Sequence, residues 1–371
     1  MNRVKGWCPS AHRPMMSGDG LLVRIKPPLG RLSADDVLAL CEFATRYGSG
    51  LIDVTSRANL QIRGVSEADH PALLEALISA GLVDANADRE AGRTIVATPF
   101  WTEGDLTTRL FKTVSDTVAR FDLPGKFGIA LDTGPAPVLQ GVSGDFRFET
   151  TDKGALLLRA EGSEKGRVIG NTDAETALTE MLHWFFDTGG AAIGRMARHL
   201  KTTPLPECWQ QALPGRFAGR PGLGGVIGGR MVGVPFGSTD ADTLTGLMAE
   251  TGAAALRVTP WRMLFLEGAQ PAEVPGILTA WSPVLDVAAC PGAPLCEQAS
   301  VATRDLARDL SDIVKGPLHV SGCAKGCARP SAAALTLVGR DGRFDLVRAG
   351  RAGDTPVQTG LTAAEVRLLE L

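Results

Sequence analysis

The sequence predicts an α+β fold that contains a duplicated unit, and the prediction depends on a weak internal repeat. The order strand, helix, strand, helix occurs near the amino terminus and again after residue 230. The matching positions in the two strand pairs are Val54-Thr55 with Val258-Thr259, Leu60 with Leu264, Ile62 with Leu266, and Gly64 with Gly268. Coincidence is the alternative for so weak a repeat, and the shared order of four elements favours duplication.

The first copy begins with the apolar run Leu21–Ile25, which is typical of a strand. Ser33 precedes two aspartates and predicts a helix start, because a serine side chain caps the free N–H groups of a first turn. The expected apolar side of this helix consists of Val37, Leu38, Leu40, Cys41 and Ala44. The run Leu51–Arg63 is β-like, and Pro71–Ala80 is expected to form a second helix.

The second copy begins with the β-like run Met231–Val234. The segment Thr239–Asp242 is expected to open a helix that contains Leu244, Leu247 and Met248. Leu256–Leu266 is the next strand region, and Val274–Trp281 is the next expected helix.

The rest of the chain is interpreted as two larger α+β domains. Strands are expected at Thr94–Ala97, Gly128–Leu131 and Ala155–Ala160, and helices at Leu106–Phe121 and Ala174–Asp187. The Gly- and Pro-rich stretch Pro214–Gly229 is expected to link the two halves. We therefore place the domains at residues 1–85, 86–215, 216–283 and 284–371.

Charge and hydropathy argue against two classes of protein. Charged residues make up 21% of the chain and the net charge is −3, so the basic face of a dedicated nucleic-acid binder is not expected. No apolar run is long enough for a transmembrane helix, and Met1–Gly20 lacks the apolar centre of a signal peptide. We expect a soluble, cytoplasmic protein with neither a nucleic-acid nor a membrane partner. In that reducing compartment, paired cysteines indicate metal binding rather than disulfides.

Four of the seven cysteines form two close pairs. Five residues separate Cys290 from Cys296, and three separate Cys323 from Cys327. Four thiolates are a complete ligand set for a [4Fe–4S] cluster or for a tetrahedral zinc ion. Both pairs lie in turn-rich loops and neither has the short spacing of a zinc knuckle, which favours the cluster. Structural zinc and four unrelated cysteines are the alternatives.

The pattern C-x5-C…C-x3-C beside a duplicated α+β unit resembles the nitrite/sulfite reductase superfamily over nearly the whole chain. The resemblance implies two ferredoxin-like half-units plus two larger α+β domains of the cluster-binding and haem-binding type. Thr55–Gly64 looks like the T-x-R-x-x-x-Q strand of that superfamily. The segments Arg93–Val96 and Leu123–Phe127 look like its R-N-V-L and L-P-R-K-F segments.

This resemblance implies roles for particular residues. Arg57, Arg93 and Lys126 are then active-site residues, and Cys327 is the cysteine whose sulfur bridges the cluster and a sirohaem iron. One position departs from the pattern, because sulfite reductases carry a second Lys where this chain has Gly128. The departure puts sulfite reduction in doubt and leaves nitrite reduction open.

Three segments near the amino terminus point to one subgroup: Gly6-Trp7-Cys8-Pro9, Arg13-Pro14-Met15 and Gly18–Arg24. They resemble the precorrin-3B synthases of aerobic cobalamin biosynthesis. Those enzymes hydroxylate precorrin-3A at a meso carbon, with lactone formation by a ring acetate, using dioxygen and reducing equivalents from NADH. The resemblance implies a tetrapyrrole substrate, dioxygen, a [4Fe–4S] cluster and a separate reductase that donates electrons. It leaves open whether sirohaem, a mononuclear iron or neither accompanies the cluster.

The strand region after Val54 is expected to have one apolar and one polar face, because successive side chains of a strand point in opposite directions. The polar face contains Arg57, Asn59, Gln61 and Arg63. Such a face is either exposed or lines a polar pocket. The resemblance favours the pocket, where these residues and Arg93 are expected to bind the carboxylates of the tetrapyrrole.

Two other functions are alternatives: a sirohaem-dependent assimilatory nitrite or sulfite reductase, and a non-catalytic iron–sulfur electron-transfer or structural zinc protein. His319 lies near the second cysteine loop and is expected to be a hydrogen-bonded structural residue. The stretch Gly189–Arg195 lacks G-x-G-x-x-G spacing and is not predicted to bind a nucleotide.

Overall fold

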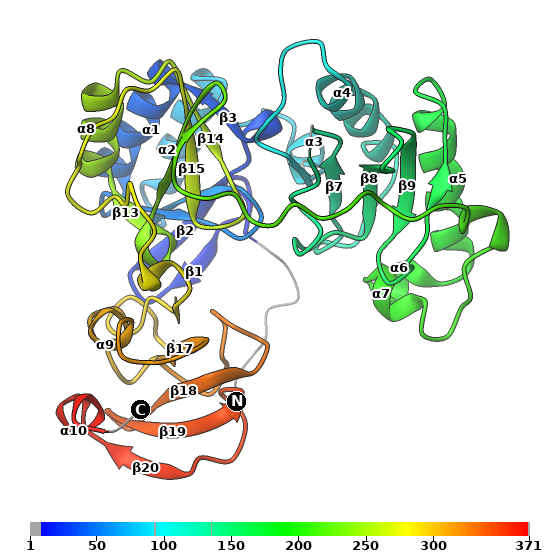
Figure 1. Cartoon of the computed structure of the whole chain (residues 1–371). Helices are drawn as coiled ribbons and strands as arrows, with labels where there is room; N and C mark the ends of the chain where they lie inside the picture. The colour runs from blue at the N-terminus through cyan, green and yellow to red at the C-terminus, as the bar shows by residue number, and fades with distance from the viewer. Residues whose placement is uncertain (1–8, 93, 135, 370–371) are drawn as a thin grey trace.

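The computed structural model describes residues 9–92, 94–134 and 136–369, and the strands in these ranges form four five-stranded sheets. The predicted α+β class and the duplicated architecture are confirmed (Figure 1). No helix in the described ranges is long and apolar enough to cross a membrane.

The two half-units have antiparallel sheets of matching order, and each contributes one strand to the other. The first sheet has the order β1 (Met15–Ser17), β2 (Gly20–Ile25), β5 (Leu60–Val65), β4 (Leu51–Val54) and β13 (Ser238–Asp240). The second has the order β11 (Gly224–Val226), β12 (Gly229–Gly233), β15 (Met263–Glu267), β14 (Ala255–Val258) and β3 (Arg31–Ser33). Strand β13 therefore pairs with β4 of the first copy, and β3 pairs with β14 of the second. This exchange joins the half-units into one body.

Helices α1 (Ala34–Tyr47) and α8 (Ala241–Thr251) begin at matching caps and pack against each other. Ser33 forms a capping box with Asp36, and the Asp240 carboxylate accepts a hydrogen bond from the N–H of Thr243. The helices and both sheets share one apolar core, which includes Val23, Leu40, Ile62, Leu247, Leu256 and Leu264. Helix α2 (His70–Ser79) packs on α1.

Two expected details of the repeat are wrong. Val274–Trp281 is not a helix, because Pro275 and Gly276 form a turn in which Gly276 has a φ of 86°. Proline is tolerated in a first helical turn, so the positive φ of Gly276 is the feature that departs from helical geometry here. Leu38, expected on the apolar side of α1, is 43% exposed.

The middle domain follows helix α3 (Ala87–Gly92) and has a mixed sheet. Its order is β6 (Ile95–Ala97), β7 (Ile129–Asp132), β8 (Phe146–Thr150), β9 (Leu156–Ala160) and β10 (Arg167–Val168). Strands β6, β7 and β8 are parallel, whereas β9 and β10 are antiparallel to their neighbours. Helices α4 (Leu106–Val118) and α5 (Ala174–Asp187), both predicted, share an apolar core with the sheet. Two short helices follow, α6 (Gly190–Ile193) and α7 (Met196–His199).

The C-terminal domain repeats the sheet pattern of the middle domain. Its order is β16 (Ala288–Ala289), β17 (Leu318–Ser321), β18 (Ala333–Arg340), β19 (Arg343–Gly350) and β20 (Gln358–Leu361). The first three strands are parallel and the last two antiparallel to their neighbours. Helices α9 (Arg304–Leu310) and α10 (Ala363–Arg367) pack on it.

Two matching turns of the half-units connect them to the larger domains. Pro28–Gly30 and Pro235–Gly237 each place a non-glycine residue at positive φ, 54° at Leu29 and 57° at Phe236. Leu29 packs against the core of the middle domain, and Phe236 belongs to the core of the C-terminal domain. The joined half-units thus carry one larger domain on each copy (Figure 1).

Candidate functional site

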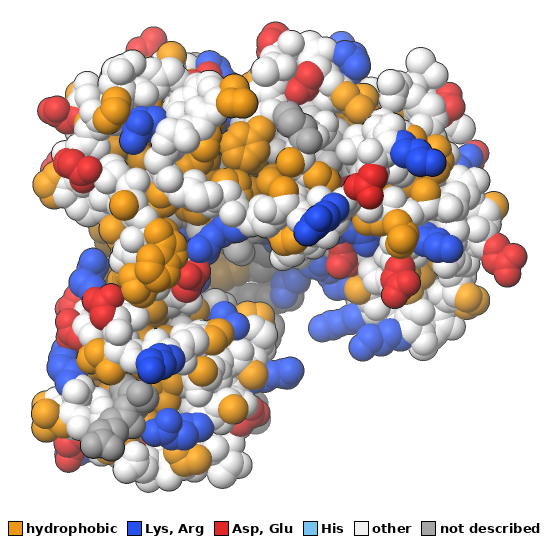
Figure 2. All heavy atoms as spheres, viewed as in Figure 1, with side chains coloured by type: hydrophobic (Ala, Val, Ile, Leu, Met, Phe, Trp, Pro, Cys, Tyr) orange, Lys and Arg blue, Asp and Glu red, His pale blue; other side chains and the backbone are white. Residues whose placement is uncertain are grey.

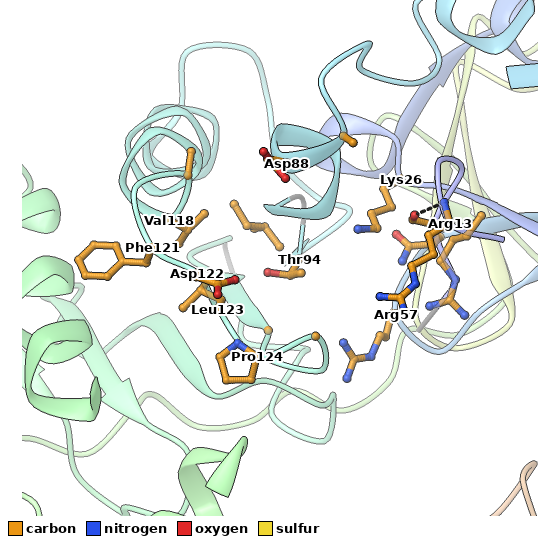
Figure 3. A pocket seen from close by; sticks show the side chains of 18 of the residues that line it. Arg13, Lys26, Arg57, Asp88, Thr94, Val118, Phe121, Asp122, Leu123 and Pro124 are labelled. Atoms are coloured by element: carbon orange, nitrogen blue, oxygen red, sulfur yellow. Dashed lines mark hydrogen bonds between the residues drawn. The ribbon is translucent and has the colours of Figure 1, made fainter. Parts of the chain in front are cut away.

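A cavity of about 700 Å³ lies between the first half-unit and the middle domain. Figure 3 shows Arg13, Lys26 and Arg57 on the half-unit side of this cavity. The middle domain supplies an apolar wall made of Val118, Phe121, Leu123 and Pro124. The volume lies in the range of sites that enclose small organic ligands.

The lining of the cavity is basic. Among the described residues that form it, the cationic side chains are Arg13, Arg24, Lys26, Arg57 and Arg120, and the acidic ones are Asp88 and Asp122. In the space-filling view, Lys and Arg side chains also gather along the rim of the hollow between the middle and C-terminal domains (Figure 2). An anionic ligand with several carboxylates would find its preferred partners in this cavity, since a guanidinium donates two parallel hydrogen bonds to a carboxylate.

Arg57 is held at the edge of the cavity by a tight turn between β4 and β5. The Thr55 hydroxyl accepts hydrogen bonds from the N–H groups of Arg57 and Asn59, at 3.3 and 3.2 Å. Ala58 closes the turn at a φ of 52°. Both Arg57 and Asn59 line the cavity, and their role in substrate binding stays a prediction.

The other two residues of that polar face lie elsewhere. Gln61 accepts two hydrogen bonds from Arg24, at 3.0 and 2.6 Å, and so orients an arginine that lines the cavity. Arg63 is only 2% exposed and pairs with Asp19 and Asp53, so the structure does not support it as a substrate-binding residue. Its guanidinium points toward the cysteine loops instead.

Lys126 enters the site through its backbone. Its side chain is exposed and is not part of the cavity lining, whereas its carbonyl accepts hydrogen bonds from Arg57 at 2.9 Å and from Arg195 at 3.1 Å. Gly128 does line the cavity, and a Cβ built there would meet no atom closer than 3.5 Å. The backbone therefore has room for a side chain at Gly128, and what distinguishes this position is the absence of a positive charge.

Arg195 is a site residue that the sequence did not single out. It ion-pairs with the buried Asp145 at 3.0 Å and donates to the Ser143 hydroxyl at 3.0 Å. Asp145 also accepts from the N–H of Gly128. Burial raises the pKa of Asp145, and hydrogen bonding together with the charges of Arg195 and Arg57 opposes that rise. This carboxylate thus fixes the loop that carries Lys126 and Gly128.

Arg93 and the segment Gly6–Cys8 lie outside the described residues. Thr94, which follows Arg93, lines the cavity. The role predicted for Arg93 stays a prediction.

The four predicted cluster ligands follow the carboxyl ends of two neighbouring parallel strands. Cys290 and Cys296 lie in the loop after β16, and Cys323 and Cys327 lie in the loop after β17. The N–H of Gly322 donates to the Cys290 sulfur at 3.1 Å. Burial raises the pKa of Cys327, the charge of Lys325 opposes this rise, and the charges of the three other cysteines add to it.

Within the described ranges, no three His, Cys, Asp or Glu side chains are grouped closely enough to hold a single metal ion. Two further observations nevertheless fit a larger group between the cysteine loops. Both ring nitrogens of His319 and the Nε of Arg304 are buried without a hydrogen-bond partner. The expected hydrogen-bonded His319 is therefore not found. Unpaired buried donors call for a partner, and sulfur atoms of a cluster accept such hydrogen bonds.

The glycines of these loops also allow a close approach of backbone to backbone. A Cβ at Gly322 would lie 2.5 Å from that of Ala299, and one at Gly292 would lie 2.9 Å from the backbone N of Thr303. Cys41 is buried on α1 and Cys208 is exposed, and burial raises the pKa of Cys41 to about 11. These two thiols belong to other parts of the fold.

Strand β5 connects the cavity with the cysteine loops. Asn59, just before the strand, lines the cavity, and Arg63 donates to the carbonyl of Leu295, beside Cys296, at 3.1 Å. A strand advances about 3.4 Å per residue, so these contacts lie roughly 14 Å apart along the chain. One strand thus supports both parts of the candidate site.

Comparisons with known proteins agree with this arrangement. Residues 13–80 match the model of the nitrite/sulfite reductase ferredoxin-like half domain. Over 98% of its length the chain is 30% identical to a precorrin-3B synthase from Sinorhizobium sp., of which it covers 88%. The chain belongs to the precorrin-3B synthase family. The family expected from the motifs is therefore confirmed.

Other relatives show the wider superfamily. A ferredoxin–nitrite reductase from Synechococcus elongatus is 32% identical over 40% of this chain and 31% of that protein. The NirA protein of Mycobacterium tuberculosis has a TM-score of 0.65 and 19% identity, over 94% of this chain and 79% of that chain. The likeness to NirA shows a shared fold.

Proposed function

We propose that this chain catalyses the oxygen-dependent hydroxylation of precorrin-3A, with lactone formation, to give precorrin-3B. The observation that carries the proposal is the basic cavity, which strand β5 connects to the cysteine loops. Membership of the precorrin-3B synthase family supports the choice of substrate.

The cavity offers separate surfaces for the two chemical parts of a tetrapyrrole. Arg24 and Arg57 are placed to bind its acetate and propionate groups, and each is held by a hydrogen bond to the protein. Pro124, on the opposite wall, is placed to cover an apolar ring face. Binding at both surfaces would hold the macrocycle in one orientation, which is how a large ligand presents a single carbon to an oxidant.

The cysteine loops supply the redox part of the proposal. Cys290, Cys296, Cys323 and Cys327 would hold a [4Fe–4S] cluster, which when bound supplies single electrons to the reaction. We propose that the electrons come from NADH through a separate reductase and that the enzyme works in the reducing cytoplasm. Iron in excess of the four cluster atoms would belong to a sirohaem or a mononuclear centre.

Gly128 favours this proposal over a sirohaem-dependent sulfite reductase. A reductase that adds electrons repeatedly to a small anion needs positive charge and proton donors at one spot. The side chain of Lys126 is exposed and is not part of the cavity lining, and Gly128 has no side chain. Hydroxylation of a large bound ligand makes a smaller demand of that kind.

Binding measurements with charge variants test the proposed pocket. Arg57→Ala should weaken binding of precorrin-3A or a stable uroporphyrinoid analogue by about 10-fold to 100-fold, because a charge-assisted hydrogen bond contributes about 1.5–3 kcal/mol. Lys126→Ala is the matched control, since it removes an equal charge from a nearby residue outside the cavity lining. Fluorescence or absorbance titration at low salt measures both.

Equal affinity of the Arg57→Ala variant and the wild-type protein for the ligand would contradict the proposal that the tetrapyrrole binds in this cavity. A loss in Lys126→Ala as large as that in Arg57→Ala would show a general charge effect and contradict the specific pocket.

A further inference from the structure

The loop between Cys290 and Cys296 is docked on the tip of the β1–β2 hairpin. The carbonyl of Leu295 accepts hydrogen bonds from the Ser17 hydroxyl at 2.9 Å and from Arg63 at 3.1 Å. A Cβ at Gly18 would lie 2.7 Å from the backbone N of Glu297, so only glycine permits this approach. The first half-unit therefore fixes the position of the Cys296 loop.

Behind this contact lies a buried chain of alternating charges. Arg63 pairs with Asp19 at 2.9 Å and with Asp53 at 2.8 Å. The other carboxylate oxygen of Asp53 is buried without a hydrogen-bond partner, and it faces Arg304 at 3.9 Å. Among the described residues, the ion-pair partner of Arg304 is Asp53, at this long distance.

Arg304 ends this chain beside Cys290. It follows Thr303, whose hydroxyl donates to the Cys290 carbonyl at 2.5 Å. Its side chain is 21% exposed, and its Nε is buried without a partner. Burial lowers the pKa of Arg304, as does the charge of Arg63, whereas the charges of Asp53 and Cys290 raise it.

The balance of charge among these four side chains determines how much of the positive charge of Arg304 is neutralised. Asp19 and Asp53 carry two negative charges, and Arg63 already makes close pairs with both. At 3.9 Å from Asp53, the guanidinium of Arg304 is only partly neutralised. An iron–sulfur cluster becomes more negative when it is reduced, and a nearby fixed cation stabilises the reduced form. In a partly buried site this attraction is weakly screened.

We propose that Arg304 is a positioning residue that raises the reduction potential of the cluster through its charge beside Cys290. The inference rests on the cluster of the proposed function. It adds that the electron affinity of the cluster depends on a side chain that the first half-unit orients through Asp53 and Arg63.

Three variants separate the charge of Arg304 from its shape. Arg304→Met removes the charge and keeps an unbranched chain, and Arg304→Lys keeps the charge. Arg308→Met is the matched control, because Arg308 is an exposed residue of the same helix α9. Each anaerobically purified protein is analysed for iron and sulfide, and its midpoint potential is measured by redox titration followed by electron paramagnetic resonance.

The expected result is a full cluster in the Arg304→Met variant with a midpoint potential more negative than that of the wild type. Arg304→Lys should lie between the two, and Arg308→Met should match the wild type. If Arg304→Met loads no cluster while Arg304→Lys loads fully at a nearly unchanged potential, the dependence on charge is supported as well.

A full cluster at wild-type potential in Arg304→Met overturns the inference while the proposed cluster stands. Failure of Arg304→Lys to load a cluster also overturns it, in favour of a role in shape alone. Absence of iron and sulfide from the wild-type protein removes both the inference and the proposed cluster.

Discussion

The middle and C-terminal domains have sheets of the same order, and they use the carboxyl edge of those sheets differently. In both, three parallel strands are followed by two antiparallel ones. In each domain, the residue that follows the first strand of the sheet donates its N–H to a backbone carbonyl of the second strand. Thr98 donates to Leu131 at 2.8 Å, and Cys290 donates to Val320 at 3.3 Å. Thr98 and Cys290 are therefore equivalent positions.

In the middle domain, protein groups fill this edge. Trp101 is 6% exposed and lies under the guanidinium of Arg257, with 3.7 Å between the guanidinium carbon and the ring centroid. The same guanidinium donates to the carbonyls of Pro99 and Trp101. In the C-terminal domain, the corresponding edge carries the four cysteines and the unpaired donors of His319 and Arg304.

This difference indicates how two sheets of the same order come to serve different roles, with the proposed cluster on one of them. Loops after parallel strands meet at one edge, where ligands bind without disturbing the sheet. Trp101 and Arg257 occupy this edge in the middle domain, whereas buried polar atoms of Arg304 and His319 in the C-terminal domain have no hydrogen-bond partner among the described residues. Variants that alter the carboxyl edge of one sheet at a time should separate the roles of the two domains.

The largest effect is expected from Cys323→Ser, which removes a thiolate from the C-terminal edge. Iron should fall from about four atoms per chain to a small remainder, because a cubane cluster needs its full set of protein ligands. Cys208→Ser is the control, since Cys208 is an exposed cysteine of the middle domain. Iron and acid-labile sulfide are measured in anaerobically purified protein.

Unchanged iron in Cys323→Ser would contradict the cluster assignment. So would stoichiometric zinc without sulfide in the wild-type protein.

A large loss of stability is expected from Trp101→Ala, which empties the filled edge of the middle domain. Truncation of a buried aromatic side chain costs about 3–5 kcal/mol. Trp281→Ala is the matched control, because Trp281 is 64% exposed and its removal should cost no more than about 0.5 kcal/mol. The midpoint of urea denaturation is measured, and iron per folded chain should stay at the wild-type level. A cost no larger than that of Trp281→Ala would show that Trp101 does not fill this edge.

A smaller effect, which depends on pH, is expected from Asp132→Asn. Asp132 is fully buried at the end of β7 and accepts hydrogen bonds from the N–H groups of Val138 and Leu139. Burial raises the pKa of Asp132 from 3.8 to about 6. Between these two values the native state binds more protons than the unfolded state, so stability falls as the pH rises from about 4 to about 6.

The Asp132→Asn variant should lack this decrease, which is on the order of 2–3 kcal/mol in the wild type. Urea denaturation at several pH values measures it. An equal slope in both proteins would exclude Asp132 as its source.

The sequence predicted the elements whose signals are local. Helices α1 and α8 have a cap and an apolar stripe within a few residues of each other, and both were placed correctly. The four cysteines were also local pairs, and the parallel pairing of β16 with β17 brings the pairs together. The strand β8 (Phe146–Thr150) was missed although its alternating apolar and polar side chains are typical of a strand.

The contacts that complete the candidate site depend on residues far apart in the chain. Arg63 was assigned to the pocket because it shares a face with Arg57, yet Asp19 and Asp53 pull it toward the cysteine loops. Arg195 was missed because its partner Asp145 lies on another element. The exchange of β3 and β13 between half-units likewise leaves no local signal. Ion pairs and strand exchange of this kind are fixed by tertiary packing.

The most direct test of the account is turnover of precorrin-3A under ¹⁸O-labelled dioxygen, with a reductant and an electron carrier. We expect that dioxygen is consumed and that mass spectrometry finds a product heavier by oxygen, with the label in the new hydroxyl group. Under the same electron supply, sulfite reduction should be slight. Brisk reduction of sulfite or nitrite with precorrin-3A unchanged would contradict the account and assign the chain to the sirohaem-dependent reductases.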